Sequence, residues 1–157
     1  MKYPITPAIR ELRQHKVDFE PKLYKYVARG GAEASARLLS VPLEQVVKTL
    51  IFEDENKQPL VVLMNGNHEV STKQLARLLN VKTIQSCDPA VAQKHSGYLV
   101  GGTSPFGTKR KMPVYMEESI TALPQIYLNG GKRGFLVALD PAEVVRVLKP
   151  ELVQVAV

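Results

Sequence analysis

Lys48 is the residue of this sequence whose position most directly suggests chemistry. It lies in the apolar run from Val46 to Phe52, which has the composition of a β-strand. Side chains alternate between the faces of a strand, so Lys48 would share one face with Val46, Leu50 and Phe52. A cation on that face is unfavourable unless it meets an anion in a cleft. Alternatively, Lys48 ends a short helix that follows Pro42 and interacts with the carbonyl groups at its C-terminus.

Two glycine-rich segments next to basic residues form a second chemical signal. The first, residues 97–107, contains Gly-Gly-Thr-Ser-Pro and is followed by Lys-Arg-Lys at 109–111; the second, residues 129–134, reads Asn-Gly-Gly-Lys-Arg-Gly. Paired glycines let backbone N–H groups approach a ligand closely, and the basic residues can hold phosphate. Either segment alone fits an ordinary connection between strands with a solvated basic tip. Together with Lys48, the two predict a pocket for an oxygen-rich or phosphorylated ligand.

The charge distribution favours a polyanionic partner. The chain carries 21 Lys and Arg against 15 Asp and Glu, a net charge of +6, and residues 94–134 alone hold six basic and two acidic residues. Clustered lysine and arginine neutralise phosphates, although a solvated basic face gives the same count. The candidate phosphate contacts are Lys109, Arg110, Lys111, Lys132 and Arg133.

Standard catalytic and metal-binding motifs are absent from the sequence. There is no G-x-S-x-G, G-x-x-x-x-G-K-[ST], G-x-G-x-x-G after a strand, or H-E-x-x-H motif. Cys87 lies at a predicted strand-to-helix junction, where a helix N-terminus could lower its thiol pKa, or it is small apolar filler. His15, His68 and His95 are widely spaced in polar contexts and are expected at the surface. We therefore expect no metal site and no cofactor.

Length and composition are those of one globular domain covering residues 1–157. The chain is 45% apolar and 23% charged, and its single cysteine excludes an internal disulfide and favours a reducing compartment. The longest apolar runs, 60–64 and 135–139, are far shorter than the ~18 residues that a membrane span needs. No signal peptide is recognisable at the N-terminus. These features predict a cytoplasmic protein without membrane association.

The elements that must position these residues alternate along the chain. Thr6-Pro7, Asp88-Pro89, Asp140-Pro141 and Ser71 are typical helix starts. The predicted helices cover 7–16, 31–39, 72–79, 89–94 and 141–148, with a short one after Pro42. The predicted strands cover 18–27, 47–53, 59–65, 81–86, 97–101, 112–116, 125–129, 134–139 and 152–156. Several links between strands are too short for a helical crossover, which favours an α/β (α+β) fold with a mixed sheet closing into a barrel-like core.

The ordered set of motifs resembles the YbaK/EbsC family of aminoacyl-tRNA deacylases, which is related to the editing domain of bacterial prolyl-tRNA synthetases. The matching segments are Thr6–Ala8, Tyr24, Val46–Leu50, Asp88–Gln93, Gly97–Gly107 and Ile126–Gly134. They occur in order and span most of the chain. The resemblance implies a single α/β domain with a barrel-like mixed core that hydrolyses mischarged tRNA, most often Cys-tRNA(Pro), and that can act with prolyl-tRNA synthetase.

The resemblance also implies residue roles. Lys48 and Tyr24 are the expected catalytic residues, with Lys48 near the 3′-terminal adenosine. In Cys-specific members the thiol of the substrate is thought to attack its own ester, whereas a held water does so in others. The residues expected to contact substrate are Thr49, Gly101, Gly102, Ser104, Asn129, Gly130 and Gly131.

Leu136 departs from the acidic residue that Cys-specific members often carry two positions after the equivalent of Gly134. The more apolar pocket keeps open a second substrate class, an Ala- or Ser-charged tRNA. A third alternative is a tRNA- or synthetase-binding module without catalysis.

Overall fold

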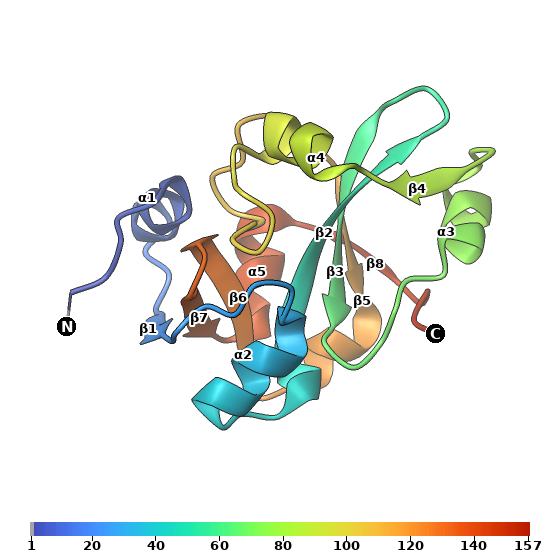
Figure 1. The fold of residues 1–157 in the computed structure, drawn as a ribbon. Coiled ribbons are helices and arrows are strands. Elements are labelled where there is room, and N and C mark those ends of the chain that lie inside the picture. The colour runs from blue at the N-terminus through green and yellow to red at the C-terminus, as the bar shows by residue number, and fades with distance from the viewer. Residues whose placement is uncertain (1) are drawn as a thin grey trace.

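The strands of the chain form two separate sheets in a computed structural model that describes residues 2–157 (Figure 1). The three-stranded sheet is antiparallel and has the order β1-β7-β6; its strands are β1 Glu20–Leu23, β6 Ile126–Lys132 and β7 Phe135–Leu139. The five-stranded sheet has the order β4-β2-β3-β5-β8. Its strands are β2 Val47–Asp54, β3 Pro59–Asn65, β4 Ile84–Ser86, β5 Val114–Glu117 and β8 Glu151–Val153.

The five-stranded sheet is mixed, as predicted. β2 runs antiparallel to β3 and β4, whereas β5 runs parallel to β3 and β8. The β2–β3 hairpin forms around the polar turn that separates the two apolar runs. The predicted α+β class is therefore confirmed.

The predicted closure into a barrel is wrong. Within residues 2–157 the two sheets meet at one isolated parallel bridge, between Val46 and Tyr127. On one side of this bridge, the residues that would extend the ladder lie in the 3₁₀ turn η1, Leu43–Gln45. On the other side, β2 and β6 no longer pair with each other, and both contribute to the walls of a cleft. The cleft thus lies where a barrel would have closed.

The helices begin where the sequence predicts. They are α1 Pro7–Gln14, α2 Gly31–Leu39, α3 Thr72–Leu79, α4 Pro89–Ser96 and α5 Pro141–Leu148, with a second 3₁₀ helix η2 at Glu118–Ala122. The side chains of Thr6, Ser71 and Asp140 each accept a backbone N–H bond at a helix start, whereas Asp88 makes no such bond. No helix among residues 2–157 has the length and apolar character needed to cross a bilayer.

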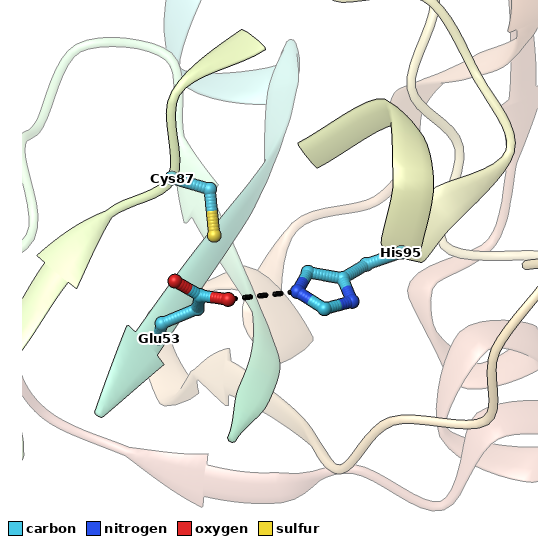
Figure 2. Close-up of side chains that lie close together, drawn as sticks. All are labelled: Glu53, Cys87 and His95. Carbon is cyan, nitrogen blue, oxygen red and sulfur yellow. Dashed lines mark hydrogen bonds and ion pairs between the residues drawn. The ribbon is translucent and has the colours of Figure 1, made fainter. Parts of the chain in front are cut away.

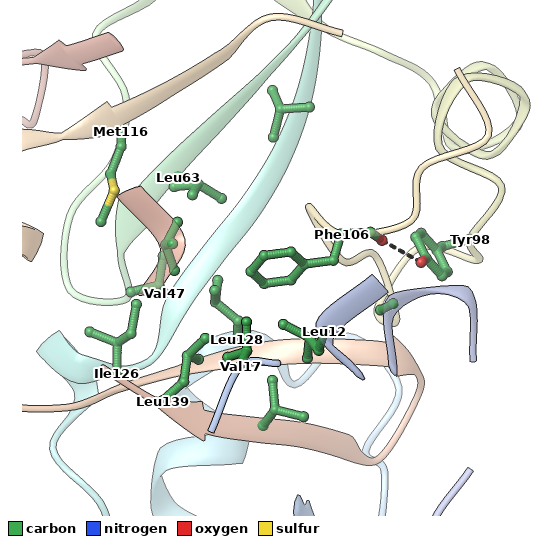
Figure 3. Close-up of a cluster of buried hydrophobic side chains, with 14 of the residues drawn as sticks. Leu12, Val17, Val47, Leu63, Tyr98, Phe106, Met116, Ile126, Leu128 and Leu139 are labelled. Carbon is green, nitrogen blue, oxygen red and sulfur yellow. Dashed lines mark hydrogen bonds between the residues drawn. The ribbon is translucent and has the colours of Figure 1, made fainter. Parts of the chain in front are cut away.

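The predicted strand at 97–101 is wrong. Gly97 ends α4 with φ +83°, and Gly101 has φ +93°, so the backbone between them turns instead of extending. The Tyr98 hydroxyl donates to the Phe106 carbonyl at 2.5 Å, which folds the segment back on itself. Because the Phe106 ring is fully buried in the main core, this glycine-rich loop is anchored rather than free (Figure 3).

Successive side chains of a buried strand point alternately toward the main core and toward the cleft side of the sheet. On β7, Phe135, Val137 and Leu139 face the main hydrophobic cluster, which Figure 3 shows around Leu63 and Leu128. The intervening Leu136 and Ala138 face a smaller cluster that α2 covers. Leu136 therefore reaches the wall of the cleft, and the neighbouring Val137 does not.

Candidate functional site

A cleft of about 660 Å³ opens between the sheets at the point where they separate. Its walls come from residues 47–51 of β2, residues 24–35 including the first part of α2, the loop 100–103, and the β6–β7 hairpin. Six of the residues expected from the sequence line it: Tyr24, Lys48, Thr49, Gly101, Asn129 and Arg133.

Lys48 lies on strand β2, as the first of the two alternatives predicts, and its backbone is opposite Met64. Its ammonium donates to the His68 carbonyl at 2.5 Å and lies 3.4 Å from the Glu69 carboxylate. The Glu69 side chain is 82% exposed, so this ion pair contributes at most about 1 kcal/mol. An ammonium has three N–H donors, and an anionic ligand can compete for them. Lys48 is thus a cation at a cleft wall whose ion pair is weak and whose main partner is a backbone carbonyl.

Thr49 has the one buried side-chain polar atom without a hydrogen-bond partner among residues 2–157. Its hydroxyl belongs to a cleft-lining residue whose strand neighbours on the same face are the apolar Val47 and Ile51. A buried hydroxyl without a partner costs about 1–3 kcal/mol. A ligand or water that reaches this oxygen would recover that energy.

Asn129 and Arg133 join the two glycine-rich loops. The Asn129 amide donates to the Gly101 carbonyl at 2.8 Å, and its oxygen accepts from the Gly131 N–H at 3.2 Å. The Arg133 Nε donates to the Val100 carbonyl at 2.9 Å, and its guanidinium lies 5.3 Å from the centre of the Tyr26 ring. The loops therefore form one wall of the cleft, and Arg133 already has partners there.

Tyr24 connects this wall to α2. Its hydroxyl accepts a hydrogen bond from the Ser35 hydroxyl at 3.0 Å, and its backbone N–H donates to the Gly134 carbonyl. The phenol is thereby oriented at the edge of the cleft.

Four of the residues expected to contact substrate do not line the cleft: Gly102, Ser104, Gly130 and Gly131. Ser104 is fully buried, and its hydroxyl accepts from the Phe106 N–H at 3.2 Å. A side chain at Gly130 would collide with the Phe135 ring, and one at Gly102 would collide with the backbone of 132–133. These residues shape the loops rather than bound the cavity.

The basic residues outside the cleft are exposed. Lys109, Arg110, Lys111 and Lys132 have solvent-accessible side chains, and the first two hold their loop to the end of α4 by backbone bonds to Ser96 and His95. They are placed for a ligand larger than the cleft, not for one enclosed within it.

Cys87 is a wall residue whose role the sequence left undecided. Burial, Glu53 and Asp88 raise the pKa of its thiol to about 11, so the helix N-terminus does not activate it. Leu136 and the residues of α2 also line the cleft. The α2 wall has no motif that could have identified it beforehand, because its members are the small residues Gly31, Ala32, Ala34 and Ser35.

The chain belongs to the family of aminoacyl-tRNA editing domains, whose model matches residues 29–147. A proposed Cys-tRNA(Pro)/Cys-tRNA(Cys) deacylase, EbsC of Enterococcus faecalis, is 27% identical over 151 residues, which cover 96% of this chain and 92% of that protein. The proline–tRNA ligase of Listeria monocytogenes is 25% identical over 97 residues, which cover 62% of this chain but 17% of the ligase.

Solved structures share the fold. The crystal structure of a proposed trans-editing enzyme for prolyl-tRNA synthetase superposes with a TM-score of 0.82 at 19% identity, over 98% of this chain and 99% of that one. The crystal structure of hypothetical protein APE2540 superposes with a TM-score of 0.88, also at 19% identity, over 96% and 99% of the two chains.

Proposed function

We propose that this protein is a trans-editing deacylase that cleaves the ester bond of a mischarged aminoacyl-tRNA. The observation that carries the proposal is the cleft of an editing-domain fold whose wall includes both Lys48, a lysine with a weak ion pair, and Thr49, whose buried hydroxyl has no partner. Such a cleft offers polar groups to a ligand, and the thiol in its wall, Cys87, is not activated as a nucleophile. Free-standing action agrees with the relationship to EbsC, which this chain matches over nearly its whole length.

The attacking group would come from the substrate or from water. Cys87 is the thiol in the cleft wall, and its raised pKa keeps it protonated at neutral pH. For a cysteinyl ester, the substrate sulfur bonds to its own carbonyl carbon while the ester C–O bond breaks. The thiol proton passes to the departing ribose oxygen, and a cyclic thiolactone leaves. With water as the attacking group, the product is the free amino acid.

Placement and electrostatics would supply the rate. Holding a nucleophile against the carbonyl contributes on the order of 7–11 kcal/mol in favourable cases. In the proposed complex the Lys48 ammonium leaves Glu69 and holds the 3′-terminal adenosine end or polarises the ester. The Thr49 hydroxyl and the Tyr24 phenol orient the aminoacyl group, and donors aimed at the developing oxyanion lower the barrier further.

The rest of the acceptor end would contact the exposed basic loops. Lys109, Arg110, Lys111 and Lys132 can neutralise phosphates, which makes binding salt-dependent. Arg133 is expected to contribute less, because it is held by Val100 and Tyr26. Prolyl-tRNA synthetase is the proposed partner that delivers the tRNA, and Cys-tRNA(Pro) is the proposed substrate.

A second substrate class is favoured by Leu136. This buried apolar side chain lines the cleft opposite Asn129, where it would contact a small aminoacyl side chain. An apolar contact of this kind suits alanine as well as cysteine. Ala-tRNA(Pro), or a Ser-charged tRNA, is therefore the alternative substrate.

The test is a panel of labelled tRNAs charged with Cys, Ala, Ser or Pro, incubated with the purified protein with and without prolyl-tRNA synthetase. We expect loss of Cys-tRNA(Pro) and retention of Pro-tRNA(Pro). Faster loss of Ala-tRNA(Pro) selects the alternative substrate, and the presence of thiolactone identifies the substrate thiol as the attacking group. Salt-sensitive tRNA binding with no cleavage of any member would instead define a binding module and overturn the proposed activity.

A further inference from the structure

Glu53, Cys87 and His95 meet at one end of the five-stranded sheet (Figure 2). Glu53 belongs to β2, Cys87 to the link between β4 and α4, and His95 to the last turn of α4. The His95 Nε2 and the Glu53 Oε2 are 2.8 Å apart, and one carboxylate oxygen, the sulfur and one ring nitrogen all lie within 4.8 Å of one another. Three elements that are separate in sequence thus bring three different donor atoms together.

The cluster is shielded from solvent. The side chains of His95 and Glu53 are 8% and 12% exposed, and Cys87 is half-buried. Polar side chains at such positions need partners. The imidazole and the carboxylate satisfy each other, whereas no hydrogen bond is formed by the thiol within residues 2–157. One carboxylate and one imidazole therefore lie beside a sulfur that a cation could bind.

We propose that Glu53, Cys87 and His95 form a binding site for a divalent transition-metal ion, with Zn²⁺ as the best fit. Thiolate, imidazole and carboxylate are zinc ligands, whereas Mg²⁺ and Ca²⁺ select oxygen donors. Zinc bond lengths of about 2.0–2.3 Å place the donors of a tetrahedral site about 3.3–3.6 Å apart. The His95–Glu53 separation would widen by about half an ångström, and the sulfur would move inward.

Proton balance follows from the hydrogen bonds. Glu53 accepts at 2.8 Å, so the proton of a neutral His95 is on Nε2, and the Arg110 guanidinium donates to Nδ1 at 3.5 Å. On metal binding, the imidazole proton moves to Nδ1, the Cys87 thiol proton is released to solvent, and Sγ and Nε2 both bind the ion. One proton leaves for each ion bound. Arg110 must then turn away from Nδ1, which its exposed side chain permits.

Three protein ligands leave one tetrahedral position for water or another ligand. Cys87 also lines the large cleft, so the ion would lie at the cleft wall beside the start of α4. It would hold β2, β4 and α4 together at the edge where β4 is a short strand. This role concerns metal binding and does not depend on deacylation.

The test titrates EDTA-dialysed protein with Co²⁺ and with Zn²⁺. We expect one ion per chain by calorimetry, and a near-ultraviolet thiolate-to-cobalt charge-transfer band. Cys87→Ser should abolish the band, whereas His15→Gln, at an exposed histidine elsewhere, should retain it. Absence of the band in the parent protein, or its persistence in Cys87→Ser, overturns the site.

Arg110→Gln gives a second test that spares the buried cluster. Because Arg110 faces the ring nitrogen that must gain a proton, its removal should tighten Zn²⁺ binding about tenfold or more, the scale of outer-shell effects on metal affinity. Circular dichroism checks that the variant is folded. Unchanged or weaker Zn²⁺ affinity in the folded variant contradicts coordination through Nε2.

Discussion

Asn129 and Leu136 are directly opposite each other in the β6–β7 ladder, and both line the cleft. One side chain of the pair binds the Gly101 carbonyl and so holds the facing loop. The other is buried and apolar, and it contacts the α2 side of the wall. A single cross-strand pair therefore sets both the position of the loop and the polarity of the cavity at this point.

Leu136→Ala should enlarge the cleft and change substrate preference. We expect kcat/KM for larger aminoacyl groups to rise relative to kcat/KM for smaller ones, because the removed side-chain atoms form part of the cleft wall. Stability should fall by about 2–5 kcal/mol, as for other buried leucines. Val137→Ala is the matched control, since it faces the main core and should lose stability without changing the ratio. An unchanged ratio in Leu136→Ala would remove Leu136 from the substrate contacts.

Lys48→Ala should slow deacylation by on the order of 10²–10³, the usual effect of removing one donor that stabilises the transition state. Its free energy of unfolding should change little through the lost ion pair, because Glu69 is largely exposed. Single-turnover deacylation and urea unfolding measure the two effects. Lys73→Ala, at an exposed position on α3, should match the parent in both. A Lys48→Ala protein as fast as the parent refutes the site assignment.

Thr49→Val should separate stability from activity. Replacing a buried hydroxyl without a partner by a methyl group of similar size removes its desolvation penalty, so stability should hold or rise by about 1 kcal/mol. Deacylation should fall if the hydroxyl orients the aminoacyl group. Thr121→Val is the contrast, since that hydroxyl donates to the Glu118 carbonyl at 2.7 Å and its loss should destabilise. A clear destabilisation by Thr49→Val would indicate an existing partner for the hydroxyl.

Asn129→Ala should loosen both glycine-rich loops, because it removes the bonds to Gly101 and Gly131. We expect a loss of about 1–3 kcal/mol in stability. Amide hydrogen exchange should become faster in 100–103 and 130–133. Asn56→Ala, in the exposed turn of the β2–β3 hairpin, should leave exchange in those segments unchanged. If the amides of these segments exchange as slowly in Asn129→Ala as in the parent protein, other contacts hold the loops.

The Glu55 carboxyl should make the free energy of unfolding depend on pH in the acidic range. Hydrogen bonds from the backbone N–H groups of Glu55 itself, Thr83 and Lys82 lower the pKa of its carboxyl from 4.5 and outweigh desolvation. Because the pKa is lower in the folded state, ionised Glu55 stabilises the fold at pH values above the pKa of the unfolded state. This stabilisation is lost as the pH falls through the pKa of the folded state. Glu55→Gln should therefore be less stable than the parent at pH 7, and the difference should shrink below about pH 4. Glu33→Gln, at an exposed position of α2, is the control for the removal of one surface carboxylate.

Local structure was largely predictable because its determinants are local. The helices at 31–39, 72–79 and 141–148 match the expected ranges, since a cap, a proline or favourable composition lies in or directly before each segment. The hairpin of β2 and β3 is of the same kind, because two apolar runs flank one polar turn. The prediction of a strand at 97–101 was wrong because it rested on the apolar residues of the segment. In the structure Gly97 and Gly101 adopt positive φ, and Phe106 is buried in the core.

The sequence by itself determined the α+β class and the concentration of basic residues around two glycine-rich segments, whereas it left Lys48 either on a strand or at the end of a helix. Only the tertiary structure decided that Lys48 lies on β2 with its ammonium donating to the His68 carbonyl. It also decided that the two sheets stay unpaired beyond the Val46–Tyr127 bridge, and that Asn129 joins the two loops. The tertiary structure also places Glu53, Cys87 and His95 next to one another. Because they are far apart in the sequence, no sequence motif contains all three. The physical reason is that helix starts and strand alternation depend on neighbouring residues, whereas sheet closure and side-chain clusters depend on how distant segments pack.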